Sequence, residues 1–310
     1  MKPLAIGTSV SGRYKLKKFK KTKSGKPYDV IETPWFDNLI TNGGLNRMFT
    51  DNTWVSTVVV GTGNSTPAIT NTALDSFLVE SINMSQIYTD AVEYEPDKWY
   101  YRWRKQAQFG EGVAEGNLQE VGINSTDNTL ISRALIVDGA GDPTTLTILS
   151  NEFLTVTYEV RRYPNLTDQT GTIVFTGSKG GSYDYTIRPS ALGGAASYGS
   201  GTVSAIHSNY CYGYSYDAHI GTIEQSPTGQ DQTLNSYDIS EQSYVTDSYQ
   251  RDIDLFFDIT HGNDVSHGLQ CVKTRIGGIF WQIEFDPYIP KRNTDELTIT
   301  LRVSVTRKTL

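Results

Sequence analysis

The chain has 310 residues, of which 37% are hydrophobic and 20% are charged, and its formal net charge at pH 7 is −7. This length is enough to bury a large core, either in one elaborate domain or in two smaller ones. No segment approaches the roughly 20 consecutive apolar residues that span a bilayer, and the first residues lack the apolar core of a secretion signal. We therefore expect a soluble protein made in the cytoplasm. Its two cysteines are too few for a disulfide framework or a thiolate zinc site.

The first part of the chain is strongly basic. Residues 1–26 contain nine Lys and Arg and no acidic residue, so the rest of the chain carries a net charge of −16. Tyr14, Leu16 and Phe19 are interleaved with the lysines, and a turn signal follows at Ser24-Gly25. This pattern predicts a β-hairpin with strands near 13–22 and 27–33, whose lysines face solvent or another subunit. Contact with nucleic acid and a disordered basic arm are the alternatives that we favour less.

Most of the remaining chain consists of short β-type segments. Stretches rich in Val, Ile, Thr, Tyr and Phe recur between clusters of Gly, Asn, Asp, Ser and Pro. The clearest predicted strands are Trp54–Val60, Lys98–Phe109, Leu130–Val137, Phe153–Arg162, Gly171–Thr176, Tyr183–Ile187, Asp252–Ile259, Gly278–Phe285 and Leu297–Val305.

Two of these strands alternate in a way that predicts one buried face. Between residues 153 and 160 and between residues 297 and 305, apolar residues occupy every second position. Such strands need a second layer to cover them. We therefore predict an all-β fold, an antiparallel β-sandwich or jelly-roll-like structure with long loops. One short helix is expected in or just after Asn38–Phe49, and a second in part of Leu74–Ile82.

A domain boundary is expected near Pro164. It would divide the chain into an N-terminal β-rich domain, 1–164, and a C-terminal β-rich domain, 165–310, although one continuous sandwich is also compatible with the pattern. Segment 190–250 is rich in Gly and Tyr, and we interpret it as an excursion of long loops from the second domain.

Several blocks resemble a known family. WFDNLITNGGLNRM, residues 35–48, follows the predicted hairpin, and later come VVVGTGNSTPAITNTALDSFL, residues 58–78, and GVAEGNLQEVGI, residues 112–123. The long block 130–164 and the closing segments FDPYIPK and LTITLRVSVTR continue the series. In order and spacing they resemble tail and minor virion structural proteins of tailed bacteriophages. The resemblance implies a component of the virion tail, made in the host cytoplasm, with other tail or collar subunits as partners.

A few groups of polar residues could in principle form a catalytic or metal-binding site. His261, Asp264 and His267 could meet around a metal ion, but their Asn/Gly-rich setting is more typical of a solvated loop. The carboxylate pairs Asp252/Asp254 and Glu93/Glu95 have strand spacing on one face, where like charges are usually just solvated. We therefore expect no catalytic residues, no hydrolytic activity, no cofactor and no metal.

Two groups of residues are candidates for structural roles. Trp35, Phe36 and Leu39 are predicted to be buried anchors at one end of the first domain. Alternating tyrosines can form a ladder on one face of a strand, able to stack against a neighbouring subunit, a loop of the same chain or a sugar. We favour a subunit interface for this ladder, which comprises Tyr210, Tyr212, Tyr214 and Tyr216.

Three classes of function follow from these observations. The leading hypothesis is a structural tail, collar, baseplate or fibre-attachment subunit, which acts by packing into a ring-like homo-oligomer without contact to membrane or nucleic acid. The second is a module of the same particle that binds host-surface glycans. An enzyme that degrades cell-wall or capsule polymers is a distant third. Large apolar interfaces would favour the first class, and a small groove lined by aromatic side chains and carboxylates would favour the second.

Overall fold

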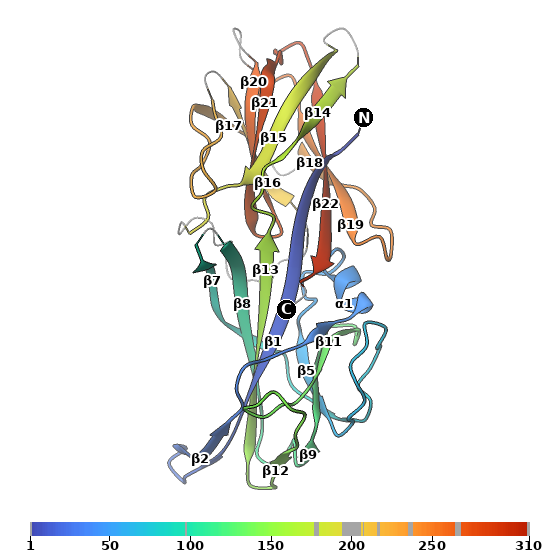
Figure 1. The fold of residues 1–310 in the computed structure, drawn as a ribbon, viewed down its shortest axis with the longest axis vertical. Helices are drawn as coiled ribbons and strands as arrows, with labels where there is room; N and C mark the ends of the chain where they lie inside the picture. The colour runs from blue at the N-terminus through green and yellow to red at the C-terminus, as the bar shows by residue number, and fades with distance from the viewer. Residues whose placement is uncertain are drawn as a thin grey trace.

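A computed structural model shows a long molecule built almost entirely of β-strands (Figure 1). It describes residues 2–96, 98–176, 180–193, 206, 208–215, 218–234, 238–263 and 268–308. Within these ranges one six-residue helix, α1 (Asn42–Arg47), is present. This helix is far too short to cross a membrane, and none of the described segments forms a longer, more apolar one. The all-β prediction is confirmed.

A nine-stranded sheet runs through most of the length of the molecule. Seven of its strands lie in the order β18-β19-β22-β1-β13-β8-β7, while β2 and β3 pair with parts of β1. Their bounds are β1 Leu4–Lys21, β2 Pro27–Glu32, β3 Phe36–Asp37, β7 Ser85–Glu95, β8 Lys98–Phe109, β13 Phe153–Pro164, β18 Ile239–Glu241, β19 Gln250–Phe257 and β22 Leu297–Arg307.

Strand β1 holds this sheet together. One of its edges pairs antiparallel with β13 over Thr8–Phe19. Its other edge pairs first with β22, in parallel, and farther along with β3 and β2. The pairing with β2 confirms the predicted hairpin, and the left-handed backbone of Gly25, with φ of 80°, closes its turn. Because β22 is the last strand of the chain, both ends of the sequence meet in the middle of one sheet.

Two smaller sheets cover the two ends of the large one (Figure 1). A five-stranded sheet has the order β4-β11-β10-β5-β6, and a six-stranded sheet has the order β14-β15-β21-β20-β16-β17. Strands β9 and β12 form a separate pair. The bounds are β4 Leu39–Ile40, β5 Thr57–Gly61, β6 Phe77–Glu80, β9 Gly116–Leu118, β10 Glu120–Asn124, β11 Leu130–Leu135, β12 Leu146–Ile148, β14 Gln169–Phe175, β15 Gly181–Pro189, β16 Ser208–Ser215, β17 Gln230–Leu234, β20 Leu269–Ile276 and β21 Ile279–Ile289.

The core lies between the inner face of the large sheet and the two smaller ones. Alternate residues of β13 and β22 are buried there, as the sequence pattern predicts. Tyr14 of β1 reaches the five-stranded sheet, where its hydroxyl lies 2.6 Å from the Ser132 Oγ. At the other end, the Arg162 guanidinium of β13 donates to the Gly277 carbonyl in the turn between β20 and β21. One connected apolar cluster therefore spans all three sheets.

Each of the nine strands predicted from the sequence is present, Lys98–Phe109 with the predicted bounds and the others with shifted ends, but two other expectations need correction. Part of Leu74–Ile82 forms strand β6 instead of a helix, because its Val79 and Glu80 pair with β5. Segment 190–250 is not only loops, since it contains β16, β17 and β18. The helix expected in or after Asn38–Phe49 is present as α1 and is capped by the Thr41 Oγ1, which accepts from the Gly44 N–H at 2.9 Å.

The large sheet draws strands from both sides of Pro164, where a boundary between two domains was expected. Strands β1, β7, β8 and most of β13 precede that residue, whereas β18, β19 and β22 follow it. The β1–β22 pairing connects residues almost 300 positions apart, for example Leu4 with Leu301. Segments 1–164 and 165–310 therefore share one sheet and one core.

We predict that Leu301→Ala lowers the free energy of unfolding by about 2–5 kcal/mol, because the substitution leaves a cavity where β22 packs into the shared core. The Leu301 side chain is fully buried. Thr298→Ala is the matched control, since it alters an exposed residue of the same strand. Urea unfolding followed by circular dichroism measures both. Equal stability of the two variants would show that β22 is not part of the core.

Candidate functional site

The outer face of the nine-stranded sheet carries a cluster of arginines around one buried carboxylate. Glu159 lies in the middle of β13, directly between Arg13 of β1 and Arg104 of β8. Its carboxylate accepts from the Nε of Arg13 at 2.8 Å, from the Nε of Arg104, and from the Nε of Arg161 at 2.6 Å. We call these four residues the arginine cluster. One carboxylate thus faces three guanidinium groups, which leaves the cluster a formal charge of +2.

Aromatic rings flank the guanidinium groups of this cluster. The Trp35 ring centroid lies 4.4 Å from Cζ of Arg13 and 5.2 Å from Cζ of Arg104. The rings of Tyr88 and Tyr100 pack in the same way against Arg104 and Arg161. Cation–π contacts of this kind favour flat, fixed guanidinium planes. The arginine cluster is therefore preorganised before any partner binds.

Burial and hydrogen bonding act in opposite directions on the Glu159 carboxyl. Burial raises its pKa, but hydrogen bonds from Arg13, Arg161 and Arg104 lower it, and the net pKa lies below the usual range. The Glu159 side chain has no solvent-exposed surface, whereas those of the three arginines are 17–25% exposed. The carboxylate therefore stays charged at neutral pH. The net positive charge of the arginine cluster faces the solvent.

More ion pairs extend this basic face in both directions. Arg102 of β8 makes two hydrogen bonds to the Asp90 carboxylate of β7, at 2.5 and 2.7 Å. Lys15 and Lys17 of β1 share the Glu32 carboxylate of β2, at 2.6 and 3.4 Å. Each of these pairs is more exposed to water than Glu159. On this face cations outnumber their paired carboxylates, in contrast to the acidic balance of the chain as a whole.

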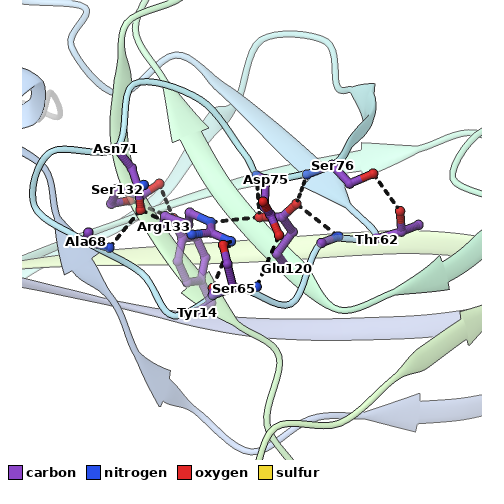
Figure 2. Close-up of polar contacts among 11 residues, drawn as sticks. Tyr14, Thr62, Ser65, Ala68, Asn71, Asp75, Ser76, Glu120, Ser132 and Arg133 are labelled. Carbon is purple, nitrogen blue, oxygen red and sulfur yellow. Dashed lines mark hydrogen bonds and ion pairs between the residues drawn. The ribbon is translucent and has the colours of Figure 1, made fainter.

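A second buried ion pair lies in the five-stranded sheet (Figure 2). Glu120 of β10 and Arg133 of β11 are both fully buried, with 2.7 Å between the Arg133 Nε and a Glu120 carboxylate oxygen. The same carboxylate accepts the backbone N–H groups of Gly63, Asp75 and Ser76. The terminal nitrogens of Arg133 donate to two further residues of the same long connection, namely Asn71 and Ser65. This network pins the connection between β5 and β6 onto the sheet.

The sequence GTG at residues 61–63 makes room for this network. A Cβ at Gly61 would lie 2.4 Å from the Ser76 carbonyl oxygen, and a Cβ at Gly63 would lie 2.5 Å from a Glu120 carboxylate oxygen. Both distances are shorter than real contacts allow, so larger residues would push Glu120 away. Glycine at both positions lets the backbone lie close to the Glu120 carboxylate of the same chain. All partners of Glu120 are internal, which makes the network a structural one.

The open edges of two sheets form an exposed apolar surface. Strand β6 ends the five-stranded sheet and β7 ends the nine-stranded sheet, and the two follow each other in the chain. Five large apolar side chains within residues 77–88 are 39–78% exposed, whereas Met84 in the same range is buried. We call this surface the apolar edge, and its members are Phe77, Leu78, Ile82, Ile87 and Tyr88. Unpaired sheet edges with exposed apolar groups are sites where other chains add or pack.

The structure separates the three predicted anchors. Phe36 is buried, with its ring centroid 5.9 Å from that of Tyr14. Leu39 is half-buried in β4, where it pairs with Arg133. Trp35 is also half-buried, and it contacts the arginine cluster on the outer face. The prediction that all three are buried anchors at one end of the protein is therefore wrong for Trp35 and Leu39. The turn into β3 puts Trp35 and Phe36 on opposite sides of the large sheet.

The tyrosine ladder lies in β16, inside the six-stranded sheet between β17 and β20. The backbones of Tyr212 and Tyr214 pair with those of Lys273 and Cys271. The side chains of Tyr210, Tyr212 and Tyr214 and the whole of Tyr216 lie outside the described residues. The predicted subunit interface at this ladder therefore stays a prediction.

The residues weighed for catalysis or metal binding are mostly paired within the chain. Asp252 makes a two-pronged ion pair with Arg302, and Asp254 accepts from the Thr300 hydroxyl at 2.6 Å. His261 lies beside Asp258, with 2.8 Å between the ring Nδ1 and a carboxylate oxygen, while 264–267 fall outside the described part of the chain. Within that described part, no group of three His, Cys, Asp or Glu is arranged to hold a metal ion.

The sequence did not indicate that Glu159 and Glu120 are central to the two ion-pair networks. Glu159 alternates with the buried residues of β13, which predicts the wet face, yet three arginines from three positions cover it completely. Glu120 stands in a strand whose neighbours are buried on both faces. The one available signal was the presence of Arg104 and Arg161 on predicted strands, because arginine is the cation that best pairs with a buried carboxylate.

Comparison with known proteins gave no match: no protein-family model, no curated protein and no solved structure is significantly similar to this chain.

We predict that Glu159→Gln lowers the free energy of unfolding by about 1–3 kcal/mol at neutral pH, because three guanidinium groups lose their charged acceptor. A depressed pKa contributes stability above the unfolded value of about 4.3 and loses it as pH falls through the folded value. The difference from the parent should therefore shrink in acid. Urea unfolding between pH 3 and pH 7 measures it. Glu32→Gln, at an exposed pair, should cost less than about 1 kcal/mol, and a cost equal to that of Glu159→Gln would contradict the assignment.

We predict that Arg133→Met costs about 3–5 kcal/mol, because it leaves the Glu120 carboxylate buried without its cation. The connection 62–76 should then become sensitive to limited proteolysis. The double variant Arg133→Met with Glu120→Gln should lose less than the sum of the two single losses, since it removes both charges. Strictly additive losses would show that the two side chains do not depend on each other.

Proposed function

We propose that this chain is a structural subunit of a tailed-phage particle that acts by packing against other subunits. The resemblance of its N-terminal and C-terminal blocks to phage tail and minor virion proteins supports this proposal. The rigid all-β architecture is compatible with it. The role proposed is assembly rather than catalysis, and it is supported by the two fully buried carboxylates, Glu120 and Glu159, being engaged by arginines of the same chain.

The apolar edge is the observation that carries the proposal furthest. Phe77 is 59% exposed and Ile82 is 78% exposed, although both are large apolar residues. They lie where two sheets leave strands without a neighbour. A soluble monomer gains nothing from such an arrangement, because exposed edges and apolar patches promote unwanted association. A neighbouring subunit that covers residues 77–88 would account for both features.

The β1–β2 hairpin offers a second contact surface. It projects from one end of the molecule, and every residue of β2 is exposed (Figure 1). Tyr28, Val30 and Ile31 are each at least 45% exposed, and lysines of β1 lie opposite them. This hairpin projects from the rest of the protein and carries apolar and cationic side chains. It is therefore suited to insertion between neighbouring subunits. Repeated contacts of this kind would close into a ring if the rotation between copies closes.

We predict that Phe77→Ser combined with Ile82→Ser leaves the isolated chain folded but lowers its incorporation into particles, because the changes weaken a subunit contact without touching the core. Val174→Ser is the matched control, since Val174 is 57% exposed on β14, far along the chain. The number of subunits per purified particle and the thermal midpoint of the isolated chain measure the two effects. Normal incorporation of the double variant, or equal loss in the control, would overturn the proposal.

A further inference from the structure

A cavity opens where β13 leaves the nine-stranded sheet. Its volume is about 390 Å³, within the range of small-ligand sites. Because β13 ends at Pro164, the strands on either side of it, β1 and the start of β8, are left with a gap between them. We call this the Trp99 cavity, and its lining consists of Gly7, Thr8, Ser9, Lys98, Trp99, Tyr163, Pro164, Asn165, Leu166, Ser304, Thr306 and Lys308.

The charged groups that line the Trp99 cavity are both cations. Lys98 shares its charge with Glu95, which lies outside the lining. The Lys308 Nζ lies 5.4 Å from the centroid of the Tyr163 ring, and the described residues offer it no ion pair. Among the described residues no carboxylate lines the cavity, and Asp97, next to Lys98, lies outside them. An anionic group that enters meets the positive charges of Lys98 and Lys308.

Trp99 contributes a largely buried side chain to the lining of the cavity. The side chain is only 9% exposed and belongs to the apolar core of the protein. Trp99 therefore forms part of the apolar wall of the cavity, and recognition of a ligand depends on the polar and charged groups of the lining.

The remaining polar groups of the wall suit a molecule with several hydroxyl groups. Ser9 and Thr306 line the cavity, and their side-chain hydroxyls have no hydrogen-bond partner among the described residues; Asn165 is part of the same lining. Hydroxyl and amide groups both donate and accept, as sugar hydroxyls do. Tyr163 adds an aromatic ring. Together, these groups offer cations for a carboxylate, donors and acceptors for hydroxyls, and a ring for an apolar sugar face.

We propose that the Trp99 cavity binds a sugar unit that bears a carboxylate. Lys308 binds the carboxylate, and Ser9 and Thr306 contact the hydroxyls. The sugar acid can be free in solution or can be one unit of an acidic polysaccharide. For a polysaccharide the adjacent surface matters, because Tyr163 contacts Tyr100, which packs on Arg161 of the arginine cluster. The site does not depend on the apolar edge, so each proposal can fail alone.

Isothermal titration with glucuronate tests the site, with glucose and acetate as matched probes that lack the carboxylate or the sugar ring. We expect glucuronate to bind at least about tenfold more tightly than either, because a charge-assisted hydrogen bond is worth at least that factor. Lys308→Gln should weaken glucuronate binding by a similar factor. Lys26→Gln, in the distant hairpin turn, should change nothing.

Other ligands distinguish the source of the sugar and the competing classes. A glucuronate polymer that binds more tightly per unit than the monosaccharide, with the gain lost in Arg161→Gln, identifies a polysaccharide; equal binding identifies the free sugar acid. The proposal is overturned if glucuronate does not bind, if glucose binds equally well, or if Lys308→Gln binds normally. It is also overturned if inorganic phosphate or an oligothymidylate binds more tightly than glucuronate. Thermal midpoints of the variants show whether each is folded.

Discussion

The inner face of the nine-stranded sheet is mostly apolar, and every other feature depends on covering it. One small sheet cannot do so, because strands β1 and β13 are longer than the part of the large sheet that one smaller sheet covers. Two sheets share the task, and Tyr14 and Arg162 mark the two points of contact. The chain can build this arrangement only by returning its last strand to its first, which places β22 beside β1. The outer face, free of any covering layer, is left for polar groups and for partners.

Two buried carboxylates show how the same chemistry serves different ends. Both Glu120 and Glu159 are fully shielded from water and paired with arginine. Glu120 has one guanidinium and three backbone N–H donors, all from one connection, so its charge is balanced and its role is internal. Glu159 has three guanidinium groups and lies on a face that no sheet covers. Only the second arrangement has a net positive charge, and Tyr100 connects its Arg161 with Tyr163 in the wall of the Trp99 cavity.

Local patterns in the sequence predicted most of the fold, because strand alternation is a local property. The apolar positions of β13 and β22 and the turn at Gly25 were found in this way. The helix expected within residues 74–82 failed because pairing with β5 overrides local propensity there. The candidate sites were largely invisible, since the partners of Glu159 come from positions 13, 104 and 161. Which distant residues meet at Glu159 depends on the order of the strands in the sheet. The alternation of polar and apolar residues along each strand does not reveal that order.

The central functional claim is that the apolar edge is covered in the assembled particle. Hydrogen–deuterium exchange, measured on the isolated chain and on intact particles, tests it most directly, because the outer N–H groups of β6 have no partner strand in the isolated chain. We predict fast exchange over residues 77–88 in the isolated chain and strong protection in the particle, while exposed residues of β14 stay unchanged. Equal exchange of residues 77–88 in both states would contradict it.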